Sequence, residues 1–106
     1  NEHYLWHGTS PWAAQKITDT DFDMKRAGSA YGSLFGPGLY FAESCLKADE
    51  YTKPDARGWY PLILCRVVLG SVKYCDERTP DPRLLEAACK GDGCDHSVMG
   101  DREKVV

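Results

Sequence analysis

The sequence lacks a tract of basic residues, a long apolar run and a leader-like beginning. Its 13 Lys and Arg stand against 16 Asp and Glu, which gives a net charge of −3. Binding to a nucleic-acid backbone needs clustered cations, so their absence argues against that function. The longest apolar stretches, 61–65 and 67–69, are far shorter than the roughly 20 residues of a membrane-spanning helix. We therefore expect a protein that does not enter a membrane and that is intracellular, in the nucleus or the cytoplasm.

Cysteine is present, but its pattern predicts neither a disulfide framework nor a metal site. The five cysteines are an odd number, which argues against disulfide pairing throughout. Cys89 and Cys94 are separated by more than the two residues of a CxxC pair, although His96 lies close enough in sequence to complete part of a zinc site. Reduced intracellular thiols are the preferred interpretation, and no metal is expected.

Length and composition predict one small folded domain over residues 1–106. The chain has 106 residues, of which 42% are hydrophobic and 27% charged, so disorder over most of it is not expected. Ser10 and Pro11 form an N-cap followed by proline at the first helical position, which predicts a helix ending near 18–20. A glycine-rich loop is expected over 25–38, and ordered loops of that length often carry function.

The spacing of apolar residues predicts the other elements. Strands are expected at 3–6, 39–42, 60–69, 72–75 and 96–98, and further helices at 43–52 and 81–89. The 60–69 stretch is a nearly continuous apolar run rich in branched residues. Both faces of that strand should therefore be covered by other parts of the chain.

Two segments carry a recognisable pattern. The first is LWHGTS at 5–10, and the second is GPGLYFA at 36–42, followed by KADEY at 47–51. Together with the strand at 62–70 and His-Ser-Val at 96–98, they resemble the catalytic domain of the poly(ADP-ribose) polymerase family, which is a diphtheria-toxin-like ADP-ribosyltransferase. The resemblance implies an α+β fold with a split, mostly antiparallel sheet and short flanking helices.

The resemblance also implies a chemistry, in which NAD⁺ is the co-substrate. ADP-ribose would pass from NAD⁺ to an acceptor protein or nucleic-acid end, through an oxocarbenium-like ribosyl cation, and nicotinamide would be released. The backbone of Gly8 would hold the nicotinamide carboxamide, because a residue without a side chain permits close approach. Tyr40 and Tyr51 would stack on the two faces of the ring. His7 would bond ribose hydroxyls.

Further residues follow from the same motifs. Thr9 would place a hydroxyl near the adenosine side, and Tyr31 in the glycine-rich loop matches a position that leans over the pocket as a lid. The catalytic set implied by the resemblance is His7, Tyr40 and Glu103. The residues implied to bind NAD⁺ are His7, Gly8, Thr9, Tyr31, Tyr40, Phe41, Ala42, Ala48 and Tyr51.

The sequence departs from the family pattern at two positions. The family has a catalytic glutamate after the segment that matches 96–98, and here Glu103 follows only a very short loop. Either Glu103 is that glutamate on a shortened hairpin, or the chain is truncated before it, and we favour the second interpretation. Ala48 stands where many family members have serine, which removes one hydrogen bond to the carboxamide, worth about 0.5–1.5 kcal/mol.

Two functions therefore stay open at this point. The first is ADP-ribosyl transfer by a partial catalytic domain that works with additional domains of the full-length protein. The alternative is a catalytically silent NAD-binding or scaffold module of the same fold. Without the glutamate, NAD⁺ could still bind, but chain elongation should fail.

Overall fold

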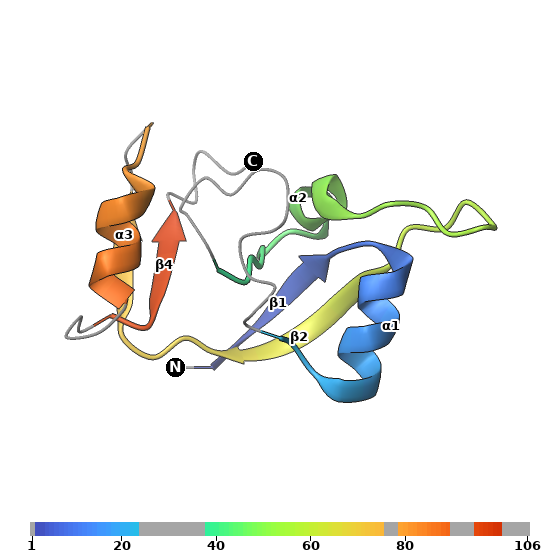
Figure 1. Cartoon of the computed structure of the whole chain (residues 1–106), viewed down its shortest axis with the longest axis horizontal. Coiled ribbons are helices and arrows are strands. Elements are labelled where there is room, and N and C mark those ends of the chain that lie inside the picture. The colour runs from blue at the N-terminus through green and yellow to red at the C-terminus, as the bar shows by residue number, and fades with distance from the viewer. Residues whose placement is uncertain (1, 24–37, 76–78, 90–94, 101–106) are drawn as a thin grey trace.

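The computed structural model describes residues 2–23, 38–75, 79–89 and 95–100. In chain order the elements are β1 (Glu2–Gly8), α1 (Pro11–Thr20), α2 (Cys45–Ala48), η2 (Asp49–Tyr51), β2 (Leu62–Val68), β3 (Val72–Cys75), α3 (Pro82–Cys89) and β4 (Ser97–Gly100). Figure 1 shows α1 beside β2 and α2 over the end of β1, with β3, β4 and α3 grouped at the opposite end of the molecule. Helices and strands are both present, so the fold is α+β as predicted.

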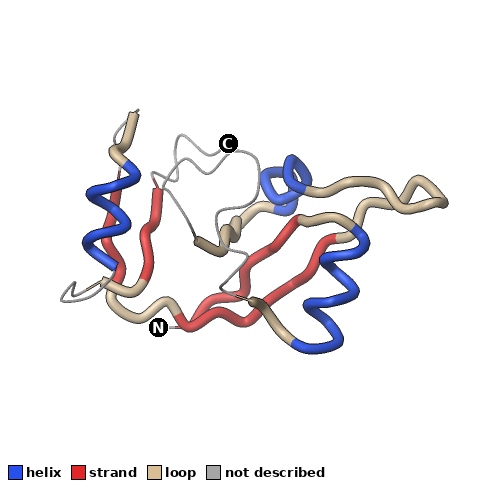
Figure 2. Tube along the Cα trace, in the orientation of Figure 1, coloured by secondary structure: helices blue, strands red, loops and turns tan. Residues whose placement is uncertain are grey.

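β1 and β2 form an antiparallel pair that is the centre of the structure (Figure 2). The register runs from Glu2 opposite Val68 to Gly8 opposite Leu62. The other edge of β1 meets the chain at Ala42, where Trp6 N–H donates to the Ala42 carbonyl at 2.8 Å and Ala42 N–H donates back at 2.9 Å. The strand predicted at 39–42 is therefore reduced to this one bridge, because only Ala42 is in register with β1.

Helix α1 forms where its local signals predict it. The Ser10 hydroxyl accepts a hydrogen bond from Ala13 N–H at 3.2 Å, and Pro11 is the first helical residue. This cap satisfies one of the backbone donors that a helix start leaves unpaired. The predicted helix at 43–52 is shorter, because α2 ends at Ala48 and the chain tightens into the 3₁₀ turn η2.

The second pair of strands is parallel. β3 and β4 pair from Val72 opposite Ser97 to Cys75 opposite Gly100. The expectation of a mostly antiparallel sheet thus holds for β1 and β2 only. His96 joins this pair to the preceding corner: its Nδ1 accepts from Ser71 N–H at 3.0 Å. A side chain at Gly70, whose φ is +64°, would meet the His96 ring at 2.5 Å, so this corner requires glycine.

The apolar core of the described residues is small and is formed by β1, α2, β3 and α3. Its buried members are Leu5, Ala48, Cys75 and Leu85. The prediction that both faces of the 60–69 strand are covered is wrong, because Leu64 is 54% exposed and Val68 is 70% exposed. Alternate residues of a strand point to opposite faces, and a continuous apolar run does not reveal that one face stays open. None of the helices in the described part of the chain is long and apolar enough to cross a membrane.

Candidate functional site

His7 lies near the end of β1 and is held from three directions. Its Nδ1 is 2.7 Å from the carbonyl oxygen of Tyr40. Phe22 meets the His7 ring edge-on at 5.0 Å between centroids, and Phe41 lies tilted against it at 5.4 Å. A carbonyl can only accept a hydrogen bond, so Nδ1 carries the proton and Nε2 is the acceptor of the neutral ring.

The environment of His7 favours that neutral form. Burial lowers the pKa of His7 below its ordinary value of 6.5, and the bond to the Tyr40 carbonyl opposes this shift without reversing it. A neutral, oriented imidazole with a free acceptor nitrogen can take a hydrogen bond from a hydroxyl group. It cannot supply a full positive charge to a ligand at neutral pH.

Gly8 is pressed against the last residue of α2. A Cβ built on Gly8 would fall on the carbonyl oxygen of Ala48 and within 2.8 Å of its carbonyl carbon. Ala48 is only 2% exposed, so this end of α2 packs closely on β1, whereas Leu46 on the outer side of α2 is exposed. The sequence assigned Gly8 a role in ligand binding alone, whereas the structure adds a packing reason for glycine: β1 and α2 touch through their backbones.

Tyr40 and Tyr51 face one another from different segments. Their ring centroids are 6.4 Å apart and the ring planes are inclined by 31°. Tyr40 stands next to the Phe41–Ala42 segment that bridges to β1, and Tyr51 is the last residue of η2. A flat ring between them needs about 7 to 8 Å, which is two carbon contacts of roughly 3.5–4.0 Å each. A small opening of the pair would therefore admit one planar ring.

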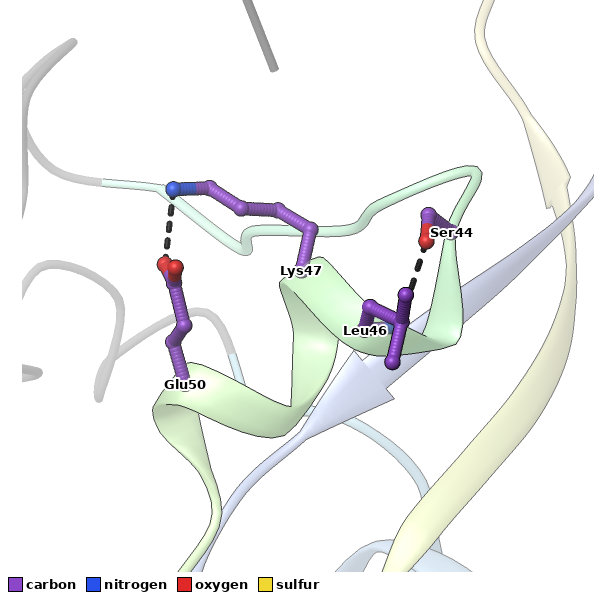
Figure 3. A network of polar contacts seen from close by, with 4 residues as sticks. All are labelled: Ser44, Leu46, Lys47 and Glu50. Carbon is purple, nitrogen blue, oxygen red and sulfur yellow. Dashed lines mark hydrogen bonds and ion pairs between the residues drawn. The ribbon is translucent and has the colours of Figure 1, made fainter. Parts of the chain in front are cut away.

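The turn that carries Tyr51 is fixed by local polar contacts, which Figure 3 shows. The Ser44 hydroxyl accepts from Leu46 N–H at 3.2 Å, and the Lys47 ammonium lies 2.7 Å from the Glu50 carboxylate. The hydrogen bond to Glu50 raises the pKa of Lys47 and outweighs the opposing desolvation. These contacts brace the turn between α2 and η2, although an exposed ion pair of this kind contributes little to stability.

Thr52 is a structural residue of the site that the sequence did not reveal. Its side chain is buried, and its hydroxyl lies 2.9 Å from the carbonyl oxygens of both Thr9 and Pro61. The residue after Tyr51 therefore joins the end of β1 to the start of β2. Nothing in the sequence marks Thr52, because its partners lie far from it along the chain.

The structure brings most of the predicted site residues together. His7 contacts Tyr40 and Phe41, Gly8 contacts Ala48, and Tyr40 faces Tyr51. Ala42 pairs with β1, and the Thr9 carbonyl accepts from Thr52. The predicted lid Tyr31, the predicted catalytic Glu103 and the cysteine Cys94 lie outside the described residues.

The cysteines of the described ranges are free thiols. They are Cys45, Cys65, Cys75 and Cys89. Within those same ranges, no three side chains of His, Cys, Asp or Glu gather as metal ligands would.

Known proteins share this sequence pattern. The family model described as the poly(ADP-ribose) polymerase catalytic domain matches residues 1–99. The chain is 34% identical over 77 residues to the poly [ADP-ribose] polymerase tankyrase of Caenorhabditis elegans, which covers 72% of this chain and 3% of that protein. It is 33% identical over 70 residues to the human protein mono-ADP-ribosyltransferase PARP12, covering 66% of this chain and 10% of that protein. The mouse protein mono-ADP-ribosyltransferase PARP11 is 35% identical over 57 residues, or 54% of this chain and 17% of its own length.

Proposed function

Because this chain belongs to the family of poly(ADP-ribose) polymerase catalytic domains, we propose that it transfers ADP-ribose from NAD⁺ to an acceptor protein and releases nicotinamide. The observation that carries this proposal is the pair of facing rings, Tyr40 and Tyr51, 6.4 Å apart. They lie beside His7, whose ring is bonded to the Tyr40 backbone. Both the acceptor and the intracellular location expected from the sequence stay predictions.

The nicotinamide ring suits the pair of tyrosines in chemistry, and in shape once the pair opens slightly. It is planar, so it can stack on both rings, and each offset aromatic contact adds about 0.5–1.5 kcal/mol beyond burial. Its carboxamide needs one donor and one acceptor, which the backbone N–H and C=O of Gly8 can supply.

His7 orients the ribose of NAD⁺ in this proposal. Its Nδ1 proton is used by the Tyr40 carbonyl, so Nε2 is left to accept a hydrogen bond from a ribose hydroxyl. Holding the sugar in one orientation lowers the entropic part of the barrier to transfer.

The transfer breaks one bond and forms another. The bond between the ribose anomeric carbon and the nicotinamide nitrogen breaks, and nicotinamide leaves with the electron pair as a neutral molecule. The acceptor nucleophile bonds to that carbon and loses its proton to a base. Glu103 is the candidate for this base and for stabilising the ribosyl cation. The curated relatives extend far beyond the matched segment, and we expect further domains to act with this one.

Binding of benzamide and of benzoate tests the pocket. Benzamide has the ring and carboxamide of nicotinamide, whereas benzoate has two acceptor oxygens and no donor. Benzamide should raise the melting temperature, with an increase that follows the logarithm of ligand concentration once the site is saturated. Benzoate should raise it far less because the Gly8 carbonyl then lacks a donor. No shift with millimolar benzamide would refute the pocket.

Labelled NAD⁺ tests the transfer itself. Incubation of the full-length protein with NAD⁺ carrying a label on its adenine should place that label on protein. Benzamide binding without any labelling by the full-length protein selects the alternative function, an NAD-binding module that does not transfer. Labelling of protein that is abolished by Glu103→Gln would support Glu103 as the catalytic glutamate.

A further inference from the structure

A groove separate from the facing tyrosines runs between α1 and the segment that leads into β2. Its volume is about 430 Å³. Figure 1 shows this segment extending past the end of the β1–β2 pair and returning close to α1. The side chains used in the argument below are Gln15 and Thr18 from α1, and Asp55, Trp59 and Tyr60 from the opposite wall.

Two adjacent aromatic residues form the exposed wall of the groove. Trp59 is 67% exposed and Tyr60 is 55% exposed. Large aromatic side chains contribute strongly when a partner covers them, and together they mark a surface suited to contact. The chain leaves these two rings at the rim of a hollow and does not bury them in its core.

The Trp59 ring already has a cationic side chain of the same protein over it. The guanidinium carbon of Arg57 lies 5.7 Å from the centroid of the Trp59 ring, which is the geometry of a cation–π contact. Trp59 lines the groove and Arg57 is not among the lining residues. Because both faces of an aromatic ring have the same negative quadrupole, a cation from a partner is suited to contact Trp59 from within the groove.

One carboxylate lines the groove, and two more follow the lining residue Thr18 in sequence. Asp55 lines it, and its Oδ1 accepts from Arg57 N–H at 2.8 Å and from Trp59 N–H at 3.0 Å. An ionised carboxylate has about four acceptor positions, so capacity for a cationic partner remains. Beyond Thr18, the exposed Asp19 and Asp21 end α1, where the helix dipole adds a further partial negative charge.

We propose that this groove binds a lysine- or arginine-bearing segment of a partner polypeptide. One cationic side chain lies over Trp59 beside Asp55, and a second approaches the acidic end of α1. One N–H of the Gln15 amide donates to Asp19 Oδ1 at 3.0 Å, and its oxygen and second N–H can bond the peptide backbone. Aromatic rings take the aliphatic stems of lysine and arginine as well as their charges, which favours these side chains over a simple cation.

The groove is next to the candidate site. Its floor includes Ile63, which pairs with His7 across the ladder, and Leu62, which pairs with Gly8. A polypeptide held there would be presented beside the end of β1. The idea that the groove positions an acceptor polypeptide rests on the proposed transferase function. The proposal that the groove binds a cationic polypeptide does not.

Calorimetric titration without NAD⁺ tests the binding. The probes are an acetylated and amidated peptide of alternating arginine and alanine, and its counterpart with citrulline in place of arginine. The arginine peptide should bind, and the citrulline peptide should bind at least about tenfold more weakly because it has no charge. Affinity for the arginine peptide should fall as salt concentration rises.

Matched variants locate the binding. Trp59→Ala and Asp55→Asn should each weaken binding of the arginine peptide about fivefold or more. Asp55→Asn keeps an oxygen for the two backbone amides, so the turn is retained while the charge is lost. Trp12→Ala is the control, because Trp12 is an exposed aromatic residue of α1 outside the groove lining, and it should leave the affinity unchanged.

Several outcomes would overturn the proposal. They are absent binding of the arginine peptide, equal affinity for the citrulline peptide, or equal weakening by Trp12→Ala. Direct binding of a single-stranded oligonucleotide to the chain, measured without peptide and lost in Trp59→Ala, would identify a nucleic acid as the occupant and would equally reject it. All groove variants should keep the benzamide-induced shift in melting temperature. Loss of peptide binding and loss of benzamide binding can therefore be distinguished from one another.

Discussion

The imidazole Nδ1 of His7 donates to the carbonyl oxygen of Tyr40 at 2.7 Å, across a separation of 33 residues in sequence. This bond joins the two sequence motifs, because His7 lies in the first and Tyr40 lies in the second. It also selects one tautomer of His7 and points Nε2 away from Tyr40. A single hydrogen bond thus sets both the position of the segment around Tyr40 and the chemical character of the imidazole.

The lowered pKa of His7 predicts a dependence of stability on pH. The folded chain binds a proton at His7 less readily than the unfolded chain, whose value is 6.5. As the pH falls below that value toward the folded-state pKa, the unfolded chain takes up the proton first, and the free energy of unfolding decreases. Above the unfolded value this contribution is constant.

Replacement of His7 by a neutral residue should remove this dependence. Urea unfolding of the wild type and of His7→Gln, from about pH 5 to pH 7.5, measures it. As the pH falls, the free energy of unfolding of the wild type should decrease more than that of His7→Gln. A difference that is the same at all these pH values would show that His7 keeps its ordinary pKa.

The contact between Gly8 and Ala48 predicts a sharp sensitivity to the smallest side chain. In Gly8→Ala the new methyl group would collide with the Ala48 backbone, and overpacking of this kind costs about 1–3 kcal/mol. Gly38→Ala is the matched control, since a Cβ at Gly38 has nothing within 4 Å. Urea unfolding should show a loss for Gly8→Ala and a change within about 0.5 kcal/mol for Gly38→Ala.

Equal stability of the two alanine variants would contradict this packing. The contact also changes how ligand binding by Gly8 variants must be interpreted. Loss of benzamide binding in Gly8→Ala could follow from displacement of α2 alone. The comparison of benzamide with benzoate, made on the unaltered chain, is therefore the sharper test of the carboxamide contact.

The elements that the sequence predicted correctly are those with local causes. Helix α1 follows from the cap at Ser10 and the proline at Pro11, which act on neighbouring backbone. Helix α3 similarly begins at Pro82. The two helix starts needed no knowledge of distant partners. The common site of His7 and Tyr40 was instead implied by the family resemblance, and the structure brings these two residues together.

The errors concern pairing over long distances. The length of the strand at 39–42 depends on how much of it stays in register with β1, and only Ala42 does. Leu64 and Val68 are apolar like their neighbours, although the fold leaves both exposed. The parallel pairing of β3 and β4 depends on the connection through α3. Apolar spacing contains none of this information, since it reports the period of an element and not its partner.

Thr52 should contribute to stability through its hydroxyl. Thr52→Val keeps the shape of the side chain but leaves the carbonyls of Thr9 and Pro61 without this donor, which should cost about 1–3 kcal/mol. Thr52→Ser should retain most of the stability. Thr18→Val is the control, because the Thr18 hydroxyl bonds its own helix at an exposed position. The melting temperature of Thr18→Val should be close to that of the wild type. A Thr52→Val variant as stable as the wild type would show that the two carbonyls are satisfied in another way.

Tyr51 should act through its ring and not through its hydroxyl. Tyr51→Ala removes one of the two faces that enclose the proposed nicotinamide position, so the affinity for benzamide should fall by the stacking contribution of about 0.5–1.5 kcal/mol plus the lost apolar contact. Tyr51→Phe keeps the ring and should bind benzamide nearly as well as the wild type. Isothermal titration with benzamide measures both variants.

The control for Tyr51 is an exposed tyrosine elsewhere on the chain. Tyr74 lies on β3 and is highly exposed, so Tyr74→Ala should leave benzamide affinity unchanged. If Tyr51→Ala binds benzamide as tightly as Tyr74→Ala, the facing rings do not form the pocket. If Tyr51→Phe is as weak as Tyr51→Ala, the hydroxyl carries the interaction, and the proposed stacking is wrong. Only loss with alanine and retention with phenylalanine agrees with a planar ring enclosed between Tyr40 and Tyr51.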